Sequence, residues 1–140
     1  MPAFDQCHDQ VVRALEKEGW RLEAAPYRVF TKYRSIYIDA EFTHQDDNHL
    51  QHIILVEVKC FPDENSTTTD LYNAIGQYLV YRDMLIETET ALPLYLTVPY
   101  TIFEKVFDAA IQRVIKDNRI DVIVIDLEQE EIVQWIESST

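Results

Sequence analysis

Two charged side chains stand inside the most strand-like segment of the sequence, HIILVEVKCF at residues 52–61. The segment is almost continuously apolar and rich in branched residues, which is typical of a buried β-strand. Glu57 and Lys59 are two positions apart, so on a strand their side chains point to the same face. Unpaired charge inside a sheet costs free energy. The pair therefore indicates either an ordinary ion pair on a sheet face or a functional site.

The periodicity of apolar residues along the chain predicts a mixed α/β fold. Helices are expected over residues 4–18, 71–87 and 102–116. Strands are expected over residues 20–24, 33–42, 52–61, 92–99, 120–127 and 131–136. Thr69 or Asp70 is the expected N-cap of the long helix. Residues 1–140 suit one domain, and this order of elements predicts a central sheet covered by helices.

The net charge of −13 argues against a nucleic acid partner, because phosphate contacts need Lys and Arg. The charge is unevenly distributed, however. Residues 1–34 carry six basic and five acidic residues, whereas residues 35–140 carry six basic and twenty acidic residues. Three interpretations stay open: a basic edge that meets DNA, an acidic surface that meets a basic protein, and a merely solvated acidic surface.

The sequence also predicts the cellular location of the protein and the redox state of its two cysteines. No apolar run is long enough to span a bilayer and no leader-like segment is seen, so a cytoplasmic protein is expected. Cys7 and Cys60 have no CxxC spacing and are too few for a disulfide framework. They are expected to be reduced, packed thiols.

Asp39 is the expected partner of the charged pair. Its strand, residues 33–42, is separated from the next by a polar turn, so the two strands are predicted to form a hairpin. Asp39 can then lie beside Glu57 and Lys59. Two carboxylates from neighbouring strands suit Mg²⁺ or Mn²⁺, and a nearby amine can orient a water or stabilise negative charge.

Asp39 followed by Glu57-Val58-Lys59 resembles the PD-(D/E)xK arrangement of the restriction-endonuclease-like superfamily. This resemblance implies a restriction-endonuclease-like fold with a central mixed β-sheet. It also implies that the Val58 carbonyl adds a metal ligand. Gln77 and Tyr81 resemble the Q-x-x-x-Y motif of RecB-type nucleases, and a spacing of four places them on one helical face. The alternative for these two is a core tyrosine with a polar neighbour.

A wider resemblance covers nearly the whole chain. The segments YIDAEF, VEVKCF, AIGQYLVYR and EEIVQWI are similar to those of the XisH family. Members are small cyanobacterial proteins named as controlling factors for excision of the fdxN DNA element. The resemblance implies the superfamily fold and an XisI-like protein as partner.

Two functions follow as expectations. The first is a Mg²⁺- or Mn²⁺-dependent deoxyribonuclease in which Asp39, Glu57, Lys59, Gln77 and Tyr81 form the site. The second is a catalytically silent protein of the same fold that assists a site-specific recombinase or pairs with an XisI-like partner. A homodimer is compatible with both, because the last strand is apolar.

His8 is a further candidate ligand. Nucleases of the superfamily often carry a glutamate on the first helix, and this chain has His8 at the equivalent distance before Gly19. Its imidazole can bind a metal or take a proton near neutral pH. A surface or capping role is the alternative.

Overall fold

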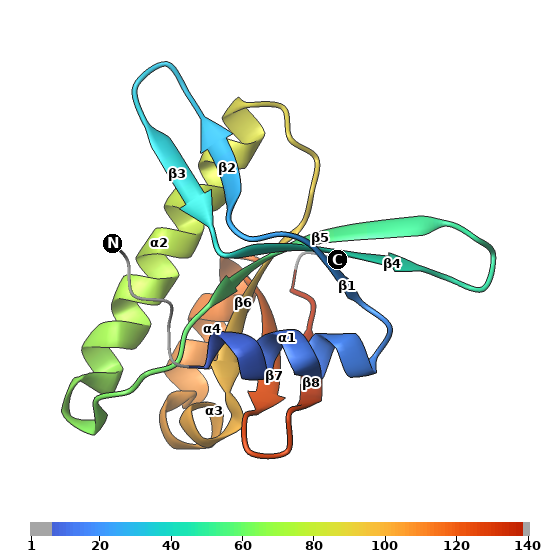
Figure 1. Cartoon of the computed structure of the whole chain (residues 1–140). Coiled ribbons are helices and arrows are strands. Elements are labelled where there is room, and N and C mark those ends of the chain that lie inside the picture. The colour runs from blue at the N-terminus through green and yellow to red at the C-terminus, as the bar shows by residue number, and fades with distance from the viewer. Residues whose placement is uncertain (1–6, 139–140) are drawn as a thin grey trace.

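The computed structural model describes residues 7–138, which form a mixed β-sheet between two layers of helices (Figure 1). The elements are α1 (His8–Lys17), β1 (Arg21–Ala24), β2 (Tyr27–Phe30), β3 (Ser35–Ile38), β4 (Ala40–Gln45), β5 (Gln51–Val58), the short 3₁₀-helix η1 (Glu64–Ser66), α2 (Thr67–Glu87), β6 (Leu94–Pro99), α3 (Tyr100–Val106), α4 (Ala109–Asp117), β7 (Asp121–Asp126) and β8 (Glu131–Ile136). Within this described part, no helix has the length and apolar character needed to cross a membrane.

The central sheet has six strands in the order β1-β4-β5-β6-β7-β8. Strands β5, β6 and β7 run parallel, and the outer pairings are antiparallel. The predicted hairpin is confirmed in β4 and β5, where Ala40 lies opposite Val56. The predicted last strand is confirmed as β8, at one edge of the sheet.

Each face of the sheet has its own core. Helix α1 packs Val11 and Leu15 against Phe42 and Val56 on one face. Helices α2, α3 and α4 cover the other face, where the Tyr78 side chain is almost fully buried. The Tyr78 hydroxyl donates a hydrogen bond to the Leu94 carbonyl at 2.7 Å. This bond satisfies the polar end of the ring, which would otherwise be costly to bury.

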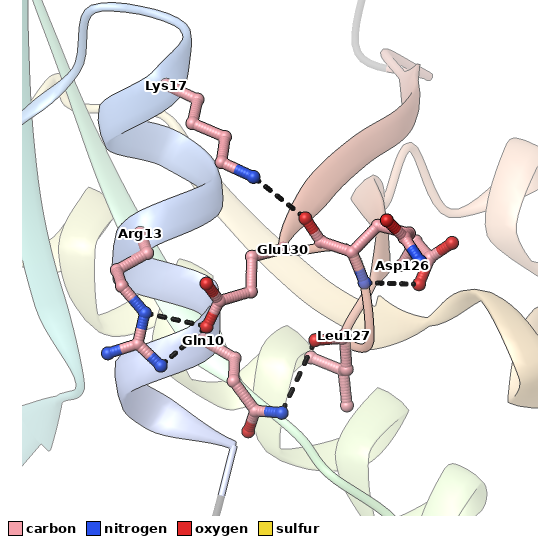
Figure 2. Close-up of polar contacts among 7 residues, drawn as sticks. Gln10, Arg13, Lys17, Asp126, Leu127 and Glu130 are labelled. Atoms are coloured by element: carbon pink, nitrogen blue, oxygen red, sulfur yellow. Dashed lines mark hydrogen bonds and ion pairs between the residues drawn. The ribbon is translucent and has the colours of Figure 1, made fainter.

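Polar contacts hold α1 to the turn between β7 and β8 (Figure 2). The Arg13 guanidinium pairs with the Glu130 carboxylate, and Lys17 Nζ donates to the Gln129 carbonyl at 2.8 Å. Exposed pairs of this kind contribute little stability individually. Together they connect α1 to the β7–β8 turn at the edge of its apolar contact with the sheet.

The strand expected over residues 33–42 is divided at Asp39. Its first half, β3, pairs with β2 in a separate hairpin, and β2 was not predicted at all. The division has a packing cause. Ile36 and Ile38 are buried on the α2 face, whereas Ala40 and Phe42 are buried on the α1 face. The chain therefore changes sheets between β3 and β4, and both halves keep their apolar residues inside.

Helix boundaries differ from the expected ones at two places. The helix expected over residues 102–116 is two helices, because the Asp108 side chain accepts a hydrogen bond from the Ile111 amide at 2.9 Å and caps a new start. Helix α2 begins at Thr67, so the prediction of Thr69 or Asp70 as its N-cap was wrong. The predicted start of the first helix at Phe4 lies outside the described residues.

The expectation of reduced cysteines was wrong. Cys7 and Cys60 form a disulfide, with their Cα atoms 5.7 Å apart. The two residues are 53 positions apart in sequence, so only the tertiary fold brings them together. The bond joins the residue before α1 to the segment that follows β5.

Candidate functional site

Two hydrogen bonds join Asp39 to the end of β5, where Glu57 lies. The Asp39 amide donates to Glu57 Oε1 at 3.1 Å, and the Val58 amide donates to Asp39 Oδ2 at 2.7 Å. Each carboxyl group thus accepts a hydrogen bond from a main-chain amide at the point where β3 gives way to β4. The structure thus brings Asp39 beside Glu57, as the predicted pairing of their two segments led us to expect.

Lys59 completes the predicted group. Its Nζ lies 3.6 Å from Glu57 Oε2. The Glu57 side chain is almost entirely buried, whereas about a quarter of the Lys59 side chain is exposed. Lys59 is therefore more accessible to an incoming molecule than the buried Glu57 carboxyl beside it.

The pKa of the buried Glu57 carboxyl is well above its ordinary value. Burial is the main reason that the pKa of Glu57 is raised from 4.5 to about 8; the negative charge of Asp39 also raises it, and the Lys59 cation lowers it by less. At neutral pH the Glu57 carboxyl therefore keeps its proton in much of the population. Two acids that resist ionising together are a site that a cation would stabilise.

Gln77 and Tyr81 lie on α2, which covers the same face of the sheet. Gln77 Nε2 donates to the Tyr81 hydroxyl at 2.9 Å. Burial raises the pKa of Tyr81, and the negative charges of Glu57 and then of Asp39 also raise it. The hydroxyl is thus within electrostatic reach of both acids. Gln77 Oε1 is buried and has no hydrogen-bond partner among residues 7–138, so it is an acceptor available to a water or a ligand.

A pocket opens beside this group, between the segment after β5 and α2. It has a volume of about 500 Å³. Its lining residues are Lys59, Cys60, Phe61, Pro62, Asp70, Asn73, Ala74 and Gln77. Sequence reasoning missed Asp70 and Asn73. They precede Gln77 by seven and four positions, and that helical spacing was the signal that could have found them.

The acids offer a partial set of metal ligands. Asp39 and Glu57 supply hard oxygen donors of the kind that Mg²⁺ and Mn²⁺ prefer. Among residues 7–138, no three His, Cys, Asp or Glu side chains are placed to share one ion. His8, at the start of α1, therefore does not complete a three-ligand group with them. The Val58 main chain, whose amide already binds Asp39, is adjacent to both acids.

Replacing Glu57 by Gln is expected to flatten the pH dependence of stability. Between about pH 4.5 and about pH 8 the unfolded carboxyl ionises while the folded one keeps its proton, so the free energy of unfolding falls as pH rises. Glu57→Gln removes this titration. Relative to the parent, the variant should gain on the order of a few kcal/mol between about pH 5 and about pH 9, measured by urea unfolding.

The matched control is Glu104→Gln, which changes the same group at an exposed position on α3. It should leave the pH profile of the parent unchanged. Parallel profiles for the parent and Glu57→Gln would contradict the raised pKa of Glu57.

Comparisons with known proteins identify the family. Residues 1–133 match the family model described as XisH protein. An XisH family protein from Nostoc punctiforme PCC 73102 is 30% identical, with a TM-score of 0.84 over 95% of this chain and 100% of that chain. A fdxN element excision controlling factor protein from Anabaena variabilis is also 30% identical, with a TM-score of 0.80 and the same coverage. No curated protein matches the chain. With a family match over most of its length and a shared α/β architecture, the chain belongs to the XisH family.

Proposed function

We propose that this chain is a metal-dependent, nuclease-like protein that acts on DNA during excision of a DNA element. The observation that carries the proposal is the convergence of Asp39, Glu57 and Lys59 at the end of β5. This arrangement supports membership of the PD-(D/E)xK superfamily. The link to excision rests on similarity to the fdxN element excision controlling factor protein of Anabaena variabilis.

Asp39 and Glu57 would hold Mg²⁺ or Mn²⁺ through carboxylate oxygens, with the Val58 carbonyl as a further ligand. A bound divalent ion polarises a phosphodiester and lowers the pKa of a coordinated water. Glu57 has to release its proton to become a ligand, and its pKa is about 8. Protons and the divalent ion therefore compete for this carboxyl below that pH.

Lys59 would act on the reacting water or on the negative charge that develops at the phosphate. Its amine carries three donors and stands beside Glu57 at the mouth of the pocket. Gln77 and Tyr81 would be positioning residues. Their mutual hydrogen bond orients both side chains. Burial raises the pKa of Tyr81, and Glu57 and Asp39 are close enough for their charges to raise it as well. The unused Gln77 Oε1 can bind a water.

Divalent ions are expected to raise the melting temperature of the protein, and more strongly at about pH 8.5 than at about pH 6, because Glu57 is protonated at the lower pH. Asp39→Asn should remove the effect, because the amide is a weaker ligand and carries no charge. The measurement is the melting temperature in the presence of Mn²⁺ or Mg²⁺, compared with that in a metal-free buffer containing a chelator.

Asp47→Asn is the control for this experiment, since Asp47 is exposed in the turn between β4 and β5. It should keep the full stabilisation. An equal shift in Asp39→Asn and in the parent would show that the ion binds elsewhere.

The parent protein is expected to cleave DNA when Mg²⁺ or Mn²⁺ is supplied, and Lys59→Ala should slow cleavage by about a hundredfold or more, which is typical for loss of a group that acts on the transition state. Lys105→Ala removes an exposed lysine from α3 and should cleave like the parent. Rates would be compared on supercoiled, linear and branched DNA. If the parent cleaves none of these with either ion, the nuclease proposal fails.

A catalytically silent accessory protein is the second candidate. Two observations favour it: the net charge is −13, and only two carboxylates converge in the described part of the site. Such a protein would bind an XisI-like partner or a site-specific recombinase. Edge strand β8 would supply the interface, because edge strands have unpaired main-chain groups. A second copy of the chain could pair with the same edge.

Co-expression with an XisI-like protein tests the accessory function. A stable complex of fixed stoichiometry, formed equally by the parent and by Lys59→Ala, is the expected result if this function is correct. Size-exclusion chromatography with light scattering gives the stoichiometry. Failure to form any complex, together with DNA cleavage, would favour the nuclease.

A further inference from the structure

The hairpin of β2 and β3 is the one strongly basic segment of an acidic protein. Residues 27–38 contain Arg28, Lys32 and Arg34 and no acidic residue. The segment carries +3 within a chain of −13, so the remaining residues carry −16. Figure 1 shows the hairpin extending beyond the central sheet beside α2.

The two faces of the hairpin have different surroundings. Val29 and Ile36 lie opposite each other in the strand pairing and are buried in the core under α2. Arg28 lies opposite Tyr37 on the outer face, and both are exposed. The inner face thus anchors the hairpin to the body of the protein, and the outer face is presented to solvent.

Aromatic rings accompany the cations. Phe30, Tyr33 and Tyr37 have 61%, 79% and 51% of their surfaces exposed, which is unusual for large rings in a folded protein. The Arg28 guanidinium carbon lies 5.7 Å from the centre of the Tyr37 ring, and Lys32 Nζ lies 5.6 Å from that of Tyr33. Cations beside exposed rings can bind phosphate while the rings stack on bases.

The three cations of the hairpin form no close ion pair with acids of the described residues. None of the ion pairs found within residues 7–138 includes Arg28, Lys32 or Arg34. Two acids of α2, Asp83 and Glu87, line the hollow beneath the tip together with Tyr33 and Arg34. These acids repel an anion that approaches from the α2 side, so an anionic ligand is expected to approach from the outer face, where Arg28 and Tyr37 lie, and to reach Lys32 and Arg34 at the tip.

We infer that the β2–β3 hairpin is a DNA-binding arm that contacts phosphates through its three cations and unpaired bases through its exposed rings. The inference rests on the proposed action on DNA and names the form of DNA that is bound, a strand with unpaired bases. The arm leads directly to the site, since β3 ends at Ile38 and the next residue is Asp39. DNA held by the arm is thereby brought to the side of the protein where the acids lie.

The test is fluorescence anisotropy with a labelled single-stranded oligonucleotide and with its duplex, in a chelator so that binding does not depend on the metal site. The parent should bind the single strand more tightly than the duplex. Replacing Arg28, Lys32 and Arg34 by Gln should weaken binding by about tenfold or more at low salt. The log–log salt slope should become shallower by about 2, as expected for three lost phosphate contacts on a single strand.

The matched control replaces three exposed cations of α3 and α4, Lys105, Arg113 and Lys116, by Gln. It makes the same change in net charge and should bind like the parent. A second variant, Tyr33→Ala with Tyr37→Ala, should lose the preference for the single strand. Circular dichroism melts would confirm that each variant is folded.

Three outcomes would overturn the inference: no DNA binding by the parent at any salt concentration, equal losses in the hairpin and control variants, or changed self-association of the hairpin variants without any effect on DNA. The last would make the hairpin a protein interface. Failure of the proposed nuclease is distinguishable from failure of this inference. A protein that binds DNA through the hairpin and never cleaves it would refute the nuclease and still support the DNA-binding arm.

Discussion

The reciprocal hydrogen bonds between Asp39 and β5 hold the structure at the point where its two sheets meet. The Asp39 carboxylate accepts from the Val58 amide, and the Asp39 amide donates to Glu57. At this residue the chain leaves the β2–β3 hairpin and enters the central sheet, and its apolar side chains change from one core to the other. Side-chain carboxyl groups accept these main-chain hydrogen bonds, so the junction and the candidate site are built from the same atoms.

This arrangement explains why an interior strand tolerates charge. Glu57 is buried beside a second acid and its pKa is raised to about 8, so the folded protein is less stable at high pH than it would be with an apolar or amide side chain. Buried groups that lower stability in this way are often retained for binding or catalysis. Lys59 offsets only part of the repulsion, and a divalent ion would offset more of it.

Much of the site could be predicted because its spacing is local. A period of two related Glu57 to Lys59, and a period of about four related Gln77 to Tyr81. The hairpin of β4 and β5 then placed Asp39 correctly. The β2–β3 hairpin was missed because β2 directly follows Pro26, which indicated a break in the chain and not the start of a strand. The disulfide and the new helix start at Asp108 depend on tertiary contacts and on a single side-chain cap, which periodicity does not reveal.

The disulfide has a mechanical consequence for the amine at the site. Cys60 follows Lys59 directly, and its bond to Cys7 joins this stretch of backbone to the N-cap residue of α1. Helix α1 covers the face of the sheet opposite α2. The backbone on the C-terminal side of Lys59 is therefore covalently tied to the helix layer on the far face of the sheet, and a displacement of this segment would also displace the start of α1.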